Sequence, residues 1–296
     1  EDPEKAGAVL ELLRMNGVRN VPEDYDQGTF PSEGAKKGTC DWKTNPGRWD
    51  TGRILAYMGT KDFTYVCADA TKSYSPAKMK SFTRQLLFIQ PDVVVVFDRV
   101  VSTQPDFKKT WLLHTVNEPT AMPDGRYYET TYGDGRLALA PVLPEKRTIT
   151  TIGGPGNEFL VAGIQYACGL NASSGRKAEL HYGELPGAWR IEESPSEPST
   201  ADYFLNVMLL TDAGSKDYPF AVARDVDPGK VELRVMTEGG IVATIRFAKA
   251  GPSGGALKLV KGADVGIAGA AWSSTGGNTV FDSPLPTEII LEDGRP

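Results

Sequence analysis

Histidine and cysteine are scarce in this chain of 296 residues, and their scarcity excludes several classes of site. The two histidines, His114 and His181, lie in no HxH or HExxH spacing of the kind that indicates zinc binding. The three cysteines, Cys40, Cys67 and Cys168, are far apart and form no CxxC pair. The sequence therefore predicts no metal and no other cofactor in this chain. Cys67 lies in a strand-like run and is expected to be a small buried residue.

Positive charge is also in short supply, which argues against nucleic-acid binding. The 32 basic residues are outnumbered by 38 acidic ones, so the formal net charge is −6. A nucleic-acid-binding protein needs a basic footprint that displaces counterions from phosphates. The sequence contains no run of 18 apolar residues, so no membrane-spanning helix is expected. It also lacks the GxSxG motif of a serine nucleophile.

The sequence is rich in strand-like segments. From about residue 53 onward, short runs of β-branched and aromatic residues alternate with turn signals such as Asp134-Gly135 and Gly239-Gly240. This pattern predicts an all-β fold, a large antiparallel β-sandwich. The only predicted helix is a short one at residues 4–16, followed by a polar, glycine-rich loop at residues 21–45.

The same pattern predicts the domain organisation. Residues 1–46 are expected to form an N-terminal helix and loop segment, and residues 47–296 the β-sandwich domain. A smaller β subdomain beginning at about residue 215 is an alternative to one continuous sandwich.

The segment from residue 82 to residue 101 predicts a long β-hairpin. Two strand-like runs flank a turn at residues 90–92. A three-residue turn sets Ile89 opposite Val93, and counting outward sets Arg84 opposite Asp98 on the face of the even-numbered residues. We therefore predict an Arg84–Asp98 ion pair. Since both faces of the hairpin are apolar, we expect it to be covered on both sides.

Six segments between residues 47 and 210 form a recognisable series. They are GRWDTGRI (47–54), FTYVCADATKSYSP (63–76), RQLLFIQPDVVVVFDRV (84–100), KKTWLLH (108–114), GAWRIEESP (187–195) and DYFLNVML (202–209). In this order they resemble the C-terminal β-sandwich region of the heparinase II/III-like polysaccharide lyases. The resemblance implies the sandwich portion of a secreted or periplasmic enzyme that cleaves an acidic, uronate-containing polysaccharide by β-elimination.

The resemblance also implies what the sequence does not contain. In the family, the catalytic tyrosine and histidine come largely from an upstream α/α-toroid, and an HxHxD-like stretch supplies ligands for a divalent metal. Neither is found in this sequence, so no catalytic residue is assigned and the chain alone is expected to be inactive. His114 is a candidate for an acid/base or carboxylate-binding role, although a hydrogen-bonded packing role is the favoured interpretation.

Cations lie beside aromatic residues between residues 36 and 53. The candidate substrate-binding residues are Lys36, Lys37, Trp42, Arg48, Trp49 and Arg53. Such a set suits sugar stacking together with carboxylate or sulfate contacts. The alternative, which is favoured, is a solvated loop whose tryptophans anchor it on the core.

A function from another class competes with the lyase. A β-sandwich of this kind also suits a non-catalytic module that binds carbohydrate or assembles with itself into a homo-oligomer. The fold alone does not choose between the two, because sandwiches serve both functions.

Overall fold

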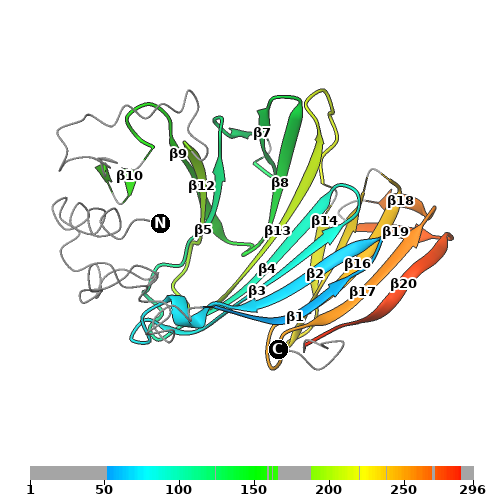
Figure 1. Ribbon diagram of the computed structural model, residues 1–296, viewed down its shortest axis with the longest axis horizontal. Coiled ribbons are helices and arrows are strands. Elements are labelled where there is room, and N and C mark those ends of the chain that lie inside the picture. Colours follow the sequence, from blue (N-terminus) through cyan, green and yellow to red (C-terminus); the bar gives the residue numbers. More distant parts are fainter. Residues whose placement is uncertain are drawn as a thin grey trace, which may run out of the picture.

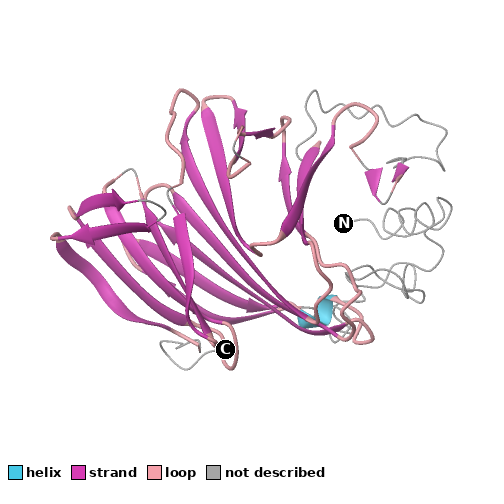
Figure 2. Ribbon diagram, turned by 180° about the vertical axis from the view of Figure 1, so that it is seen from behind, coloured by secondary structure: helices cyan, strands magenta, loops and turns pink. Residues whose placement is uncertain are grey.

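The computed structural model describes residues 52–123, 125–158, 160–161, 163–165, 188–219, 221–237, 239–268 and 271–287. Within these ranges the chain is almost entirely antiparallel β-structure (Figures 1 and 2), so the predicted all-β class is confirmed. A 3-10 turn at Thr71–Ser73 is the one helical element in this part of the chain, and no helix in it is long and apolar enough to span a membrane. The helix predicted at residues 4–16 and the boundary near residue 47 lie outside the described residues.

The largest sheet has eight strands, in the order β1-β2-β3-β4-β13-β8-β7-β6. Their bounds are β1 Arg53–Gly59, β2 Phe63–Asp69, β3 Met79–Ile89, β4 Val93–Ser102, β6 Thr120–Ala121, β7 Tyr128–Tyr132, β8 Gly135–Leu143 and β13 Ala201–Asp212. A five-stranded sheet has the order β14-β15-β16-β17-β20. Its strands are β14 Ala221–Asp227, β15 Lys230–Met236, β16 Ile241–Ala248, β17 Gly255–Lys261 and β20 Asn278–Leu285.

A three-stranded sheet has the order β5-β12-β9. It consists of β5 Trp111–Thr115, β12 Trp189–Pro195 and β9 Arg147–Gly153. Two small hairpins complete the described strands, one from β10 Leu160–Val161 and β11 Ile164–Gln165, the other from β18 Asp264–Ala268 and β19 Ala271–Thr275.

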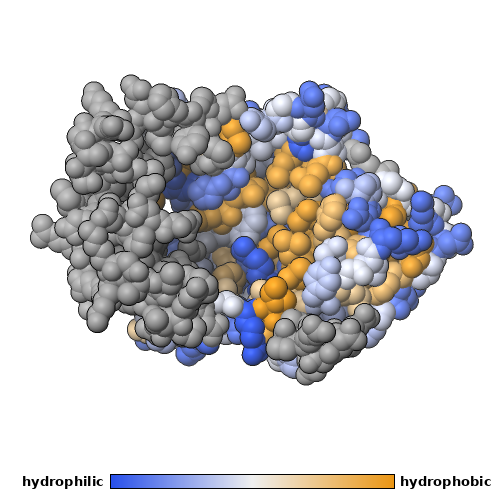
Figure 3. Space-filling view, in the orientation of Figure 1, coloured by the Kyte–Doolittle hydropathy of each residue, from blue (hydrophilic) through white to orange (hydrophobic). Residues whose placement is uncertain are grey.

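The three main sheets form layers, with the eight-stranded sheet in the middle (Figure 1). One core lies between the eight-stranded and five-stranded sheets, where the ring of Phe97 stacks on that of Phe247 at 4.7 Å between centroids. A second core lies between the eight-stranded and three-stranded sheets and includes Val96, Trp111 and Ile191. Figure 3 shows hydrophobic residues gathered over the middle of the molecule in the same view. The central sheet is therefore apolar on both faces.

The predicted hairpin is β3 and β4, and its register is confirmed. Ile89 pairs with Val93 and Arg84 pairs with Asp98. Odd-numbered residues of β4, among them Val95, face the five-stranded sheet, and even-numbered ones, among them Val96, face the three-stranded sheet. The prediction that the hairpin is covered on both sides is therefore correct, and alternation along the strand explains it.

A polar contact ties the middle layer to the five-stranded sheet. Arg99 on β4 donates from Nη1 to the carbonyl oxygens of Ala248 (3.2 Å) and Gly251 (3.0 Å), and from Nη2 to Ser253 Oγ (3.0 Å). Cys67 on β2 is fully buried nearby, as predicted, and burial raises the pKa of its thiol. Cys40 and Cys168 lie outside the described residues.

Candidate functional site

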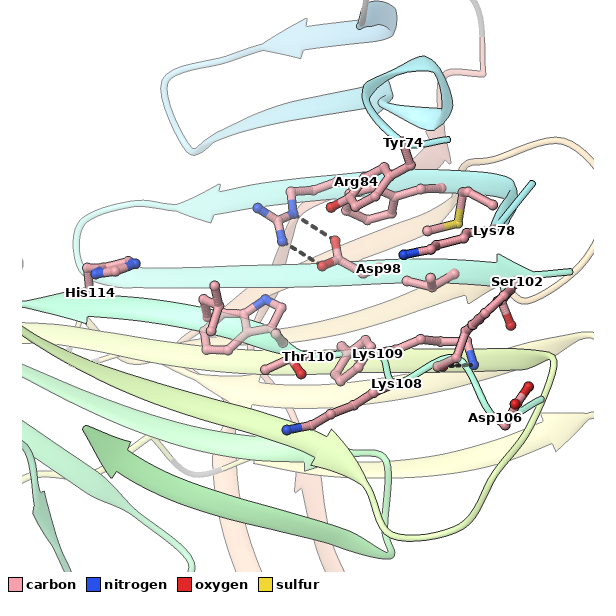
Figure 4. Close-up of a pocket in the computed structure, with 17 residues that line it drawn as sticks. Tyr74, Lys78, Arg84, Asp98, Ser102, Asp106, Lys108, Lys109, Thr110 and His114 are labelled. Atoms are coloured by element: carbon pink, nitrogen blue, oxygen red, sulfur yellow. Dashed lines mark hydrogen bonds and ion pairs between the residues drawn. The ribbon is translucent and has the colours of Figure 1, made fainter. Parts of the chain in front are cut away.

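A cavity of about 580 Å³ lies beside β3 and β4, between the turn that precedes β3 and the segment that leads into β5. Its charged and aromatic lining residues are Tyr74, Lys78, Phe82, Arg84, Asp98, Asp106, Phe107, Lys108, Lys109, Trp111, His114 and Phe204. Figure 4 shows Arg84 and Lys78 on one side, Lys108 on the opposite side and His114 at one end. Cations and aromatic rings therefore meet in one cavity.

The Arg84–Asp98 pair is the best-fixed charged group of this cavity. Arg84 donates from Nε to Asp98 Oδ1 (2.8 Å) and from Nη2 to Asp98 Oδ2 (2.7 Å), as the dashed lines in Figure 4 mark. The Asp98 side chain is 2% exposed, whereas that of Arg84 is 46% exposed. The predicted ion pair is thus confirmed, with the acid buried and the guanidinium at the cavity surface. A two-point contact of this kind fixes the plane of the guanidinium.

Burial and pairing act in opposite directions on these two groups. Burial raises the pKa of the Asp98 carboxyl, and the hydrogen bonds from Arg84 oppose that rise. The same hydrogen bonds raise the pKa of Arg84, so its guanidinium stays charged. The guanidinium also lies 5.7 Å from the centroid of the Phe82 ring, which adds an aromatic face beside the cation.

The four cations of the cavity do not serve the same purpose. Lys109 is buried and forms an ion pair with Asp202 at 2.8 Å, in which the two side chains are 6% and 10% exposed. It also donates to the carbonyl oxygen of Ser199. The positive charge of Lys109 is therefore compensated by Asp202 inside the fold. Lys108 is exposed, and Lys78 lies 5.9 Å from the ring centroid of Phe107.

His114 lies on β5, opposite Arg190 of β12, and its side chain is exposed in the cavity wall. The favoured interpretation of His114 is a hydrogen-bonded packing role, which nothing in the structure tests directly. The exposed position leaves the ring accessible to a ligand, and its acid/base or carboxylate-binding role stays a prediction. No group of three or more histidine, cysteine, aspartate or glutamate side chains that could hold a metal is found in the part of the chain that the structure describes.

The predicted substrate-binding residues are mostly outside the described ranges. This applies to Lys36, Lys37, Trp42, Arg48 and Trp49, whose role stays a prediction. Arg53 is described, and it begins edge strand β1 with an exposed side chain that does not line the cavity.

Sequence reasoning missed most of the cavity. Tyr74 belongs to the segment FTYVCADATKSYSP, and Lys108 and Trp111 belong to KKTWLLH, and both segments are part of the series of six. The missing information was that the two segments converge. The adjacent cations of Lys108–Lys109 before an aromatic strand were the available signal.

A second cavity of about 600 Å³ has a different character. It lies near the start of β8 and the end of β13 and includes Arg136. The Arg136 side chain is 3% exposed, and it donates from Nε and Nη2 to Glu129 Oε2 at 2.9 and 2.7 Å. The Arg136 guanidinium is buried as well as paired, whereas that of Arg84 is paired but exposed at the cavity surface, so the cavity beside Arg84 is the better candidate for an anionic ligand.

No family model matches this chain, and no curated protein matches it. Comparison with solved structures finds heparan sulfate lyase HepC from Pedobacter heparinus, at 16% identity and a TM-score of 0.44, covering 68% of this chain and 28% of that chain. It also finds a heparinase III gene product with methylated lysines, at 13% identity and a TM-score of 0.43, covering 67% and 27% respectively. This chain spans less than a third of the length of each of these two proteins.

Proposed function

We propose that this chain is the β-sandwich portion of a polysaccharide lyase that cleaves an acidic, uronate-containing polysaccharide, and that the cavity beside Arg84 binds the anionic sugar. The observation that carries this proposal is the fixed guanidinium of Arg84 next to aromatic rings and exposed Lys108 in one cavity. The guanidinium suits a carboxylate or sulfate, and the rings suit the apolar faces of a sugar. The series of six sequence segments supports the same substrate class.

The chemistry of β-elimination assigns roles to these groups. A base removes the proton beside the uronate carboxylate, a carbon–carbon double bond forms, the bond to the leaving oxygen breaks, and an acid protonates that oxygen. A cation beside the carboxylate offsets the negative charge that develops there. Arg84 and Lys108 fit the cation, and His114 fits one proton-transfer group. An upstream α/α-toroid of the same protein is proposed to supply the other proton-transfer group and the opposite wall.

The isolated chain of residues 1–296 is therefore expected to show no lyase activity, whereas the protein extended upstream by the toroid is expected to be active. The measurement is the rise in ultraviolet absorbance from the unsaturated uronate product, with heparan sulfate, hyaluronan, chondroitin and alginate as substrates. Robust cleavage by the isolated chain would contradict the proposal that its catalytic site is incomplete. Inactivity of the extended protein on the whole panel would favour a non-catalytic carbohydrate-binding module instead.

Binding to the cavity can be tested without activity. Replacing Lys108 or His114 by alanine is expected to weaken binding of acidic oligosaccharides about three- to tenfold, since a charge-assisted hydrogen bond to an exposed site contributes on the order of 1 kcal/mol. Isothermal titration at low salt measures the affinity. Lys146→Ala is the matched control, because Lys146 is 76% exposed and does not line the cavity. Equal affinities for all three variants and the wild type would remove the cavity from the proposal.

A further inference from the structure

The outer face of the five-stranded sheet carries an unusual concentration of arginine. Arg224 of β14, Glu232 of β15 and Arg246 of β16 lie in one row across three neighbouring strands. Arg234 of β15 and Lys258 of β17 lie in the adjacent row on either side of β16. These positions alternate with buried core residues of the same strands, so the side chains face away from the eight-stranded sheet.

A single carboxylate holds three guanidinium groups in this surface. Glu232 accepts hydrogen bonds from Arg224 Nη2 and Arg246 Nε, both at 2.9 Å, and Arg234 Nε lies 3.4 Å from Glu232 Oε1. The Glu232 side chain is 2% exposed, whereas those of Arg224 and Arg246 are 65% and 55% exposed. The carboxylate is therefore covered, and the positive groups form the surface.

The charge of this group is not balanced. Arg224 and Arg246 share the one carboxylate of Glu232, which leaves an excess of positive charge in their row, in a chain whose formal net charge is −6. In the adjacent row Lys258, which is 50% exposed, forms an ion pair with Asp282 at 3.5 Å, so this pair adds no net charge. Neutral cross-strand pairs would have been enough to hold the strands together. This excess of positive charge creates a local electrostatic potential that attracts anions.

The spacing of the arginines suits an extended anion. Neighbouring strands are about 4.8 Å apart, so the backbones of Arg224 and Arg246, which flank β15, are roughly 10 Å apart. Their guanidinium groups lie on the two oxygens of the Glu232 carboxylate. Glu232 fixes one edge of each guanidinium and leaves other N–H groups directed outward. Guanidinium groups bind carboxylates and sulfates in two-point contacts.

We infer that this surface, consisting of Arg224, Arg234, Arg246 and Lys258 and here called the arginine face, binds a polysaccharide chain through its carboxylate or sulfate groups. The eight-stranded sheet lies between the five-stranded and three-stranded sheets (Figures 1 and 2). The cavity beside Arg84 is lined by β5 of the three-stranded sheet, so the arginine face is a second and remote contact. The choice of ligand class rests on the proposed function, but neither the cavity nor catalysis is required. The two rows of the arginine face contain no aromatic side chain, which argues against stacking of nucleic-acid bases.

The test is titration of the chain with heparin and alginate oligosaccharides at low salt. The double variant Arg224→Ala/Arg246→Ala is expected to bind about tenfold more weakly and to show a smaller dependence on salt. The matched control, Lys61→Ala/Lys146→Ala, removes two cations from exposed positions elsewhere and is expected to change affinity less than twofold. Glu232→Gln, which removes the only carboxylate of the row, is expected to tighten binding. Circular dichroism and thermal unfolding confirm that each variant is folded.

The outcomes separate this inference from the proposed function. Combining the double variant with Lys108→Ala is expected to give additive losses, because distant sites act independently. Loss of binding in the arginine variants with no effect of Lys108→Ala would support the arginine face and contradict the cavity. Binding of heparin alone would identify sulfate as the recognised group, and binding of alginate as well would identify carboxylate. Affinity of the double variant equal to that of the control, or equal binding of single-stranded DNA of matched charge, would overturn the inference.

Discussion

Replacing Arg84 by alanine is expected to lower the free energy of unfolding by about 3 kcal/mol at neutral pH. The variant leaves Asp98, 2% exposed, as a buried carboxylate without its partner. Removing one member of a buried ion pair costs roughly 3–5 kcal/mol, and the lower end applies because the Arg84 side chain is 46% exposed. Urea unfolding at pH 7 measures the loss. Lys80→Ala, which removes an exposed cation from the same strand, is the control and is expected to be nearly neutral.

The same variant has an expected pH dependence. Burial already raises the pKa of Asp98, and without Arg84 nothing in the pair opposes that rise. A carboxyl whose folded pKa lies above its unfolded pKa is most favourable to folding in acid, and that stability is lost as the pH rises through the folded pKa. The deficit of Arg84→Ala relative to the wild type should therefore shrink toward acidic pH. If the loss in free energy of unfolding caused by Arg84→Ala is independent of pH, or is no larger than the loss caused by Lys80→Ala, this account of the ion pair is contradicted.

The Arg84–Asp98 pair also shows what the sequence alone could predict. Strict alternation in β3 and β4 and a short turn determined the register, so one count from Ile89 and Val93 placed the pair correctly. Local periodicity is enough to predict the register of two paired strands when both are apolar and adjacent in sequence. The burial of Cys67 followed from the same kind of pattern.

The three-stranded sheet was not predicted, for a physical reason. The segment that forms β12 carries Arg190, Glu192 and Glu193, and because of these charged residues its sequence lacks the apolar pattern typical of a buried strand. Arg190 and Glu193 are nevertheless buried, because other parts of the chain supply their partners. Such tertiary compensation overrides local strand propensity.

The candidate cavity depends on long-range contacts in the same way. Tyr74, Arg84 and His114 come from three separate segments, and only the layered packing of the sheets brings them together. All three belong to the series of six sequence segments, but that series carries no indication of the distances between them in space. The arginine face has the same origin, since its rows follow from the pairing of β14, β15 and β16.

Glu193 is the second site where a large effect is expected, because it is a carboxyl group buried between two sheets. Its side chain is 1% exposed, it accepts a hydrogen bond from Asn206 Nδ2 at 2.9 Å, and Arg147 Nε lies 3.7 Å from its Oε1. Burial raises the pKa of Glu193 to about 7, against the opposing effects of Asn206 and Arg147, and the nearby Asp98 adds to the rise. Its ordinary value, which applies to the unfolded chain, is 4.5.

The free energy of unfolding is therefore expected to fall by about 3 kcal/mol between pH 4.5 and pH 8 through Glu193 alone, since one pKa unit corresponds to about 1.4 kcal/mol. The sign follows because a raised carboxyl pKa favours folding while the group is protonated, and this contribution disappears as the pH rises through about 7. Glu193→Gln keeps the neutral form at every pH, so this variant should flatten the profile and be more stable than the wild type above pH 7. Urea unfolding across this range measures the effect, with Glu197→Gln, whose side chain is 70% exposed, as the control. If the wild type and Glu193→Gln lose stability in parallel as the pH rises, Glu193 does not titrate in this range, and Arg147 and Asn206 compensate its buried charge more fully than their distances suggest.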